Sequence, residues 1–200
     1  MKRNLLLTLL LVLFSVSCSF STLMDNNKKA EETPWIYSLY ENSMQATWRS
    51  GSGSLNFSSS EDNPDGFVGK TDYGYINPGV RAVSMLETRP QMTSHGWVEG
   101  LYPEILLPEN VHLRSYIGFK KGADASDGVT FHIFVHEGNT YSQVAVQKLF
   151  PRQYKKVDIN LSPWAGKKIQ LILKVSAGNH SKSDLAVWVN PRLDNFQGKK

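Results

Sequence analysis

Two runs of alternating apolar and polar residues dominate the middle of the chain, within residues 110–137. The alternating positions are Val111, Leu113, Ser115, Ile117 and Phe119 in the first run, and Val129, Phe131, Ile133 and Val135 in the second. Because successive side chains of a strand point to opposite faces, each run offers one apolar face for burial. The intervening sequence, GADASDG, is rich in residues that favour turns. The pattern therefore predicts two core strands joined by a loop.

The same periodicity predicts eight further short strands. They span residues 45–49, 51–60, 80–88, 97–107, 142–150, 156–161, 169–175 and 184–189, and Pro103 breaks the fourth of them. Residues 59–79 hold Asn-Pro, Asp-Gly and Pro-Gly steps, which predict a long surface loop. Turns at intervals of ~8–12 residues, without a long helical pattern, indicate an all-β fold. We expect an antiparallel β-sandwich or jelly roll.

The beginning of the chain has the pattern of an export signal. Lys2 and Arg3 precede an apolar stretch at residues 5–14, and residues 15–17 have the small side chains of a cleavage site. The apolar stretch is shorter than the ~20 residues that a membrane-spanning helix requires, and no later stretch approaches that length. The sequence therefore predicts export without a transmembrane segment.

Cys18 is the only cysteine, so the exported chain has no internal disulfide and depends on its core for stability. It follows the signal directly and resembles the lipidated cysteine of bacterial lipoproteins, although Ser15 stands where those proteins usually carry an aliphatic residue. The alternative is ordinary cleavage between Ser17 and Cys18 that leaves a free thiol. We expect a protein that is lipid-anchored to the bacterial cell envelope, and otherwise a periplasmic or secreted one.

These patterns divide the chain into four parts. We expect a signal peptide at residues 1–17, a lipidated cysteine with a flexible tether at 18–34, one β-sandwich domain at 35–194 and a frayed tail at 195–200. The formal net charge of +4 includes Lys2 and Arg3, so the chain without its signal carries only +2. The longest basic cluster, at residues 152–156, is interrupted by two uncharged residues. Charge therefore gives no support to nucleic-acid binding.

Three motifs in the second half of the chain suggest a family. Their residues are Asp127-Gly128-Val129 with Phe131; Asp158, Leu161, Ala165-Gly166 and Leu171; and Asp184, Ala186, Trp188, Pro191 and Leu193. In this order they resemble the signature of the bacterial galactose-binding-like jelly rolls of the novel carbohydrate-binding module type. The resemblance implies a jelly roll that binds a glycan or an envelope polysaccharide. It covers about half of the chain after the signal, and residues 35–95 match only in strand rhythm.

The acidic residues of these motifs have two interpretations. Asp127 and Asp184 precede strands and can accept backbone N–H bonds in tight turns, which is a structural role. The resemblance also implies that a structural calcium ion can lie near such loops, and carboxylate oxygens suit calcium. Asp127 and Asp184 are therefore the calcium candidates, whereas we expect no other cofactor.

Aromatic and basic residues give the best indication of a ligand site. Arg81 and Arg114 lie on the polar faces of their predicted strands, Trp97 directly follows the His95-Gly96 step of a loop, and His132 lies opposite the apolar face of its strand. A concave sheet lined by these four side chains would form a binding cleft. In the alternative interpretation, Trp97 covers the edge of the sandwich and the arginines pair with Glu87 or Glu99. Trp188 is expected in the core.

Catalytic and transition-metal signatures are absent from the sequence. The histidines and the single cysteine form no zinc motif, and there is no nucleophile elbow, phosphate loop or dinucleotide fingerprint. We therefore expect a non-catalytic envelope lipoprotein with a carbohydrate-binding module-like domain. The second hypothesis is a structural or assembly lipoprotein that binds a protein partner. The third is an envelope glycosidase or lyase that uses carboxylates such as Glu99, Glu104 and Asp127.

Overall fold

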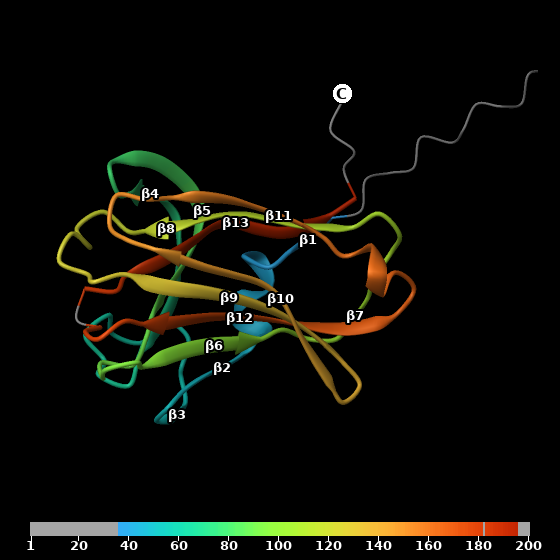
Figure 1. The fold of residues 1–200 in the computed structure, drawn as a ribbon, viewed down its shortest axis with the longest axis horizontal. Coiled ribbons are helices and arrows are strands. Elements are labelled where there is room, and N and C mark those ends of the chain that lie inside the picture. The colour runs from blue at the N-terminus through green and yellow to red at the C-terminus, as the bar shows by residue number, and fades with distance from the viewer. Residues whose placement is uncertain (1–35, 182, 196–200) are drawn as a thin grey trace, which may run out of the picture. The chain divides into compact units, whose positions relative to one another are not determined.

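A computed structural model describes residues 36–181 and 183–195 of the chain. This part contains thirteen β-strands, two short 3-10 helices and no α-helix. All of its strand pairings are antiparallel. The strands form two sheets, one above the other in Figure 1, and the predicted antiparallel β-sandwich is thereby confirmed. In the same residues, no helix has the length and apolar character needed to cross a membrane.

The first sheet contains six strands. In spatial order they are β11 (Lys155–Asn160), β8 (His112–Phe119), β13 (Ala186–Asp194), β5 (Val80–Arg89) and β4 (Phe67–Ile76), and β1 (Ile36–Ser38) pairs with the end of β13.

The second sheet contains seven strands. In order they are β10 (Thr140–Leu149), β9 (Val129–Glu137), β12 (Lys168–Ala177), β6 (Trp97–Leu101), β2 (Thr47–Ser50) and β3 (Gly53–Ser54), and β7 (Ile105–Leu106) pairs with the start of β12. The 3-10 helices span Glu41–Gln45 and Ser162–Trp164.

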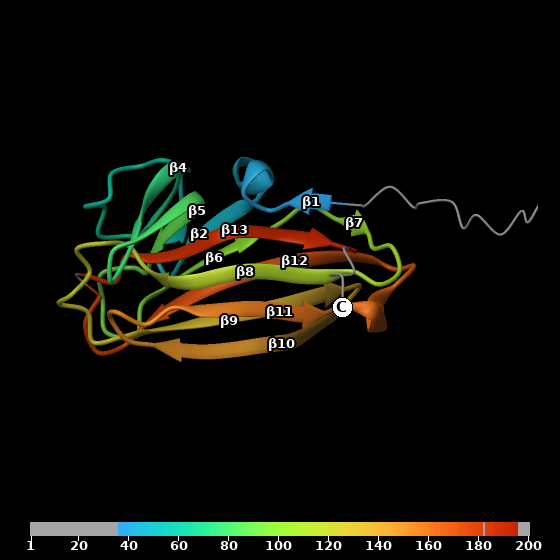
Figure 2. The same cartoon turned by 90° about the horizontal axis from the view of Figure 1, so that it is seen from above.

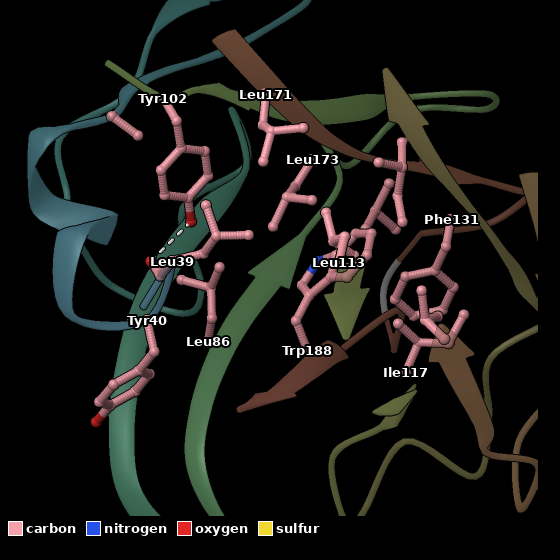
Figure 3. Packing of buried hydrophobic residues seen from close by; sticks show 14 of the residues in the cluster. Leu39, Tyr40, Leu86, Tyr102, Leu113, Ile117, Phe131, Leu171, Leu173 and Trp188 are labelled. Atoms are coloured by element: carbon pink, nitrogen blue, oxygen red, sulfur yellow. Dashed lines mark hydrogen bonds between the residues drawn. The ribbon is translucent and has the colours of Figure 1, made fainter. Parts of the chain in front are cut away.

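The main core lies between the two sheets. The apolar positions of the two central runs are all buried, but β8 and β9 belong to opposite sheets and face each other across the core. Trp188 of β13 is fully buried, as predicted, and packs edge to face on Phe131 with ring centroids 5.0 Å apart (Figure 3). At one side of this core, the Tyr102 hydroxyl donates to the Leu39 carbonyl at 3.1 Å. The edge-to-face contact of Trp188 with Phe131 stabilises the fold by ~0.5–1.5 kcal/mol beyond what the burial of their surface contributes.

The prediction of a long loop at residues 59–79 is wrong, because the ten-residue strand β4 lies within it. Gly66 and Gly79 do lie in turns, at positive φ, but the two glycines between them serve close packing within the strand. A Cβ at Gly74 would lie 2.8 Å from the sulfur of Met85, and one at Gly69 would lie 2.6 Å from the Phe67 ring. The predicted strand at 51–60 is reduced to β3. The strand expected at 184–189 continues to Asp194 as β13, so the structured domain reaches the tail.

The hairpin formed by β4 and β5 closes back onto the far end of β8. The Asn77 N–H donates to the Phe119 carbonyl at 2.8 Å, and the Lys121 N–H donates to the Tyr75 carbonyl at 2.9 Å. Ile76 and Lys120 form a β-bridge between these two contacts. The hairpin therefore covers part of the outer face of β13, at one end of the sandwich (Figure 2).

A second, smaller core fills the space beneath this hairpin. Its buried members are Ile76, Ala82, Met85 and Val187. Strict alternation along β5 places Ala82 and Met85 on opposite faces, yet both belong to this cluster. Ser84 between them has a φ of 52°, in the left-handed region, where the backbone can depart from the regular strand alternation.

Candidate functional site

A groove of about 570 Å³ lies on the outer face of the first sheet. Strands β8 and β13 form its floor, the tip of the β4–β5 hairpin lines one side, and the start of β11 lines the other. The sheet therefore supplies a rigid base, while a hairpin with its own small core supplies a wall. Volumes of ~300–1,000 Å³ are usual for sites that bind small molecules.

The floor follows from the alternation along β8. Leu113, Ser115 and Ile117 face the core, so Arg114 and Tyr116 face outward into the groove. In the strand register, Tyr116 lies between Lys156 of β11 and Val189 of β13. The Tyr116 side chain remains 46% exposed although it sits in the middle of a sheet. The ring of Tyr116 is therefore accessible from the groove.

A second tyrosine, Tyr154, lies on the other side of the floor, just before β11. It packs over Gly118 of β8, where an added Cβ would lie 3.1 Å from the Tyr154 Cβ. Glycine at this position therefore lets the tyrosine lie directly on the strand. The Tyr154 side chain is still 48% exposed, so the groove holds two accessible aromatic rings.

A β-bulge in β13 adds a polar group to the floor. The register of β13 against β8 shifts between Val189 and Arg192, and Asn190 adopts a φ of 47°. Asparagine tolerates this left-handed conformation better than most residues. The bulge leaves Asn190 exposed in the groove, where its amide can both donate and accept hydrogen bonds.

Ion pairs fix the arginines at one end of the floor. Arg114 contacts the Asp194 carboxylate and also Asp158, with 3.3 Å between its Nε and Oδ1, and Arg192 donates to Asp194 at 2.8 Å. Burial acts to raise the pKa of Asp158, but the hydrogen bond from His112 and the charge of Arg114 outweigh it, so the pKa lies below its usual range. The Asp158 carboxylate therefore stays ionised at neutral pH and orients Arg114.

The structure places the four predicted ligand residues on two different faces. Arg81 and Arg114 line the groove of the first sheet. Trp97 and His132 belong to β6 and β9 of the second sheet, so the four side chains do not line one cleft. Whether any of them binds a ligand remains a prediction.

The environment of Trp97 and His132 resembles a packed polar surface. The Lys174 ammonium lies 4.4 Å from the centre of the Trp97 ring and 3.2 Å from Glu99, which also pairs with Arg49 at 2.6 Å. Burial, followed by the charge of Lys174, lowers the pKa of His132. Glu99 therefore pairs with Arg49 and Lys174 and not with Arg81 or Arg114, which line the groove.

Sequence reasoning missed Tyr116, Tyr154, Asn190 and Arg192. Tyr116 was detectable, because it follows Arg114 at a spacing of two and so shares the polar face of the same strand. Tyr154 interrupts the basic cluster at residues 152–156, where an aromatic residue among cations was also a usable signal. Asn190 was not detectable, because only the bulge in β13 brings it to the floor.

Asp127 and Asp184 lie in adjoining turns outside the groove. The Asp127 carboxylate accepts the backbone N–H groups of Asn179 at 2.8 Å and His180 at 3.3 Å, so it links two loops, whereas the predicted structural role was within its own turn. Asp184 is fully buried and accepts a short hydrogen bond from the Ser126 hydroxyl. Burial, together with the charge of Asp127, raises the pKa of Asp184 to about 6, although Ser126 acts in the opposite direction.

Two carboxylates are available to a calcium ion at the turns that hold Asp127 and Asp184. One oxygen of Asp127 and one of Asp184 are buried without a hydrogen-bond partner among the described residues. Calcium takes ~6–8 oxygen ligands. In residues 36–181 and 183–195, no cluster of three or more His, Cys, Asp or Glu side chains could hold a metal. Backbone carbonyl oxygens also serve as calcium ligands, so calcium at Asp127 and Asp184 remains a prediction.

The fold and the groove define a class, an antiparallel β-sandwich with a sheet-face groove. No protein-family model and no curated protein matches the chain. Among solved structures, it is similar to the CBM51 module of Clostridium perfringens GH95 in complex with methyl-galactose, with 16% identity and a TM-score of 0.48 over 80% of this chain and 99% of that one.

Two further structures are similar at the same level. The CBM22-1 xylan-binding domain of Paenibacillus barcinonensis Xyn10C has 16% identity and a TM-score of 0.48, over 82% of this chain and 95% of that one. TmCBM61 in complex with β-1,4-galactotriose has 14% identity and a TM-score of 0.46, over 80% and 94%. At these distances, the fold assignment rests on the strand pairings of the chain itself.

Proposed function

We propose that the domain is a non-catalytic glycan-binding module and that the groove of the first sheet is its binding site. The observation that supports this most directly is the pair of exposed tyrosines in the groove, Tyr116 on its floor and Tyr154 beside the start of β11. Neighbouring exposed rings in one groove are more informative than an aromatic residue exposed singly, because contiguous apolar surface marks binding sites.

The chemistry of the groove suits a sugar. The face of an aromatic ring carries partial negative charge, so it attracts the weakly positive C–H groups on one side of a pyranose. The hydroxyl groups of the sugar need hydrogen-bond partners, which Asn190 and Arg81 supply from the floor and the wall. Apolar contact on one side and polar contact at the rim is the usual arrangement of a small-molecule site.

The composition of the groove supports a binding role rather than a catalytic one. A glycosidase requires two carboxyl groups about 5–10 Å apart, on either side of the scissile bond. None of the described residues that line the groove is Asp, Glu or His. The carboxylates of Asp158 and Asp194, which contact the groove residue Arg114, are held in ion pairs with it. We therefore propose binding without turnover.

A glycan array followed by pull-down with insoluble polysaccharides tests this function. We expect at least one class of polysaccharide to retain the domain well above background. The absence of retention by peptidoglycan, plant polysaccharides and host glycans alike would contradict the proposal.

We further propose that the domain is exported and held at the cell envelope by a lipid on Cys18. The support is the sequence pattern alone, because Cys18 lies outside the described residues. Detergent phase partitioning of the natural protein and of Cys18→Ala tests it. The natural protein should enter the detergent phase and the variant should stay aqueous, whereas an aqueous natural protein would contradict the anchor.

The same face favours one alternative, a protein partner. Tyr73, Tyr75, Val80 and Val83 of the β4–β5 hairpin are all more than 40% exposed beside the groove, and exposed apolar groups in such numbers occur at protein interfaces. Crosslinking in cells distinguishes the two functions. A single protein recovered in stoichiometric amount, together with an empty glycan array, would favour the partner.

A further inference from the structure

All charged side chains that line the groove are cations. They are Arg81, Arg114, Lys156 and Arg192, and the described lining contains no Asp or Glu. A glycan without charge needs no such excess, since hydroxyl groups are satisfied by neutral donors and acceptors. The excess of positive charge therefore carries information about the ligand.

The carboxylates behind the floor do not neutralise the groove. Asp194 is almost completely buried, and Arg114 and Arg192 both contact it. Asp158 is shared by Arg114, His112 and Lys156, and its contact with the Lys156 ammonium is long, at 3.6 Å. Two carboxylates thus face three permanent cations, which leaves a positive excess at this end of the groove.

Arg81 adds a cation at the other wall. It is exposed, its guanidinium lies 6.0 Å from the centre of the Tyr73 ring, and it makes no ion pair with the described residues. Packing on a ring restricts an arginine without using its hydrogen-bond donors. The planar guanidinium then remains free to bind two oxygens of a carboxylate or a sulfate at once.

We propose that the ligand of the groove is an anionic polysaccharide, whose sugars carry carboxylate or sulfate groups. The proposal rests on the glycan-binding function proposed above and specifies its substrate class. In it, Tyr116 and Tyr154 contact the sugar rings, and Arg81 and Lys156, on opposite walls, contact the anionic substituents. The spread of cations along the groove fits a polymer with repeated charges better than a single terminal acid.

Paired polymers that differ only in charge test this inference. The probes are polygalacturonate against its fully methyl-esterified form, for carboxylate, and dextran sulfate against dextran, for sulfate. We expect one charged polymer to bind at least tenfold more tightly than its neutral counterpart. Because salt shortens the Debye length from ~10 Å at 0.1 M to ~3 Å at 1 M, this preference should shrink as salt is added.

Two matched variants locate the effect. Arg81→Gln should weaken binding of the charged polymer about fivefold, as expected for the loss of one exposed charge contact. Lys148→Gln is the control, since Lys148 is also exposed, packs on a ring (Phe150) at 5.1 Å and belongs to the second sheet. It changes the net charge equally and should leave the affinity unchanged. Equal losses in the two variants would indicate attraction by net charge only and would overturn the inference.

The possible failures are distinguishable. Binding of a neutral glycan that Tyr116→Ala removes and Arg81→Gln leaves intact would overturn the anionic ligand but keep the glycan-binding function. No binding of any polymer, charged or neutral, would overturn both.

Discussion

Asp184 is the residue whose ionisation has the clearest consequence for stability. Burial, with the nearby charge of Asp127, raises its pKa to about 6. Because the pKa is higher in the folded chain than the usual 3.8, the folded state binds this proton more tightly than the unfolded state does. The associated stability is fully present below about pH 4 and is lost as the pH rises to about 6. Above that pH the loss is constant, at about 3 kcal/mol for two pKa units.

The substitution Asp184→Asn removes this charge and keeps an oxygen for the Ser126 hydroxyl. We expect it to raise the free energy of unfolding by about 1–3 kcal/mol at pH 8 and by about a third as much at pH 4.5. Urea denaturation between pH 4.5 and 8 measures the difference. The exposed Asp65→Asn is the control and should follow the natural protein.

The same titration bears on calcium. We expect neither added calcium nor a chelator to change the pH dependence, because the described residues bring no third acidic side chain to Asp127 and Asp184. A stabilisation by calcium that disappears in Asp184→Asn would show instead that the two carboxylates bind the ion, and would contradict this account of Asp184.

At the scale of elements, the β4–β5 hairpin determines the shape of the groove. Its inner side is held by the second core, in which Met85 is fully buried against Gly74 and Val187. Its end is held by backbone hydrogen bonds to Phe119 and Lys121 of the β8 end. The end of β5 that follows Met85 pairs with β13 in the sheet, whereas the distal part of the hairpin is held by this small core and these few bonds. The distal part should therefore be a separate unit of local stability.

Met85→Ala tests that independence. Removal of a buried methionine costs about 2–5 kcal/mol, and here the cavity opens beneath the hairpin. We expect hydrogen exchange to accelerate in the amides of β4 and the tip of β5, with little change in β9. Ile133→Ala, in the main core, is the control and should accelerate exchange throughout both sheets. Similar exchange patterns in the two variants would show that the hairpin unfolds only with the whole domain.

The sequence predicts most elements but not the site, for a physical reason. Alternation of apolar and polar residues depends only on neighbours in the sequence, so the strands at residues 111–119 and 129–135 can be predicted from it alone. Pairing is not local, and the assignment of Arg81 and Arg114 to one sheet and of Trp97 and His132 to the other depends on strand order. Strand β4 was not predicted because its glycines resemble turn residues. In the structure they instead let Met85 and Phe67 pack directly on the backbone, and composition alone does not distinguish the two roles.

At the scale of the whole molecule, the two outer faces offer different surfaces. The first sheet carries the groove with its tyrosines and cations. The outer face of the second sheet carries Tyr141, which stacks on His136 with ring centroids 4.1 Å apart, and Trp97, which packs under Lys174. Exposed aromatic residues alone therefore do not identify the binding face, and a direct comparison of the two faces is needed.

The most direct measurement is the affinity of the polysaccharide retained in the array for two tyrosine variants, determined by isothermal titration calorimetry. Tyr116→Ala removes a ring from the groove, and Tyr141→Ala removes an exposed ring from the other sheet. Loss of one ring contact of ~1–2 kcal/mol predicts an affinity about tenfold lower for Tyr116→Ala, with Tyr141→Ala equal to the natural protein. An unchanged affinity for Tyr116→Ala, or a loss confined to Tyr141→Ala, would contradict the assignment of the groove as the binding site.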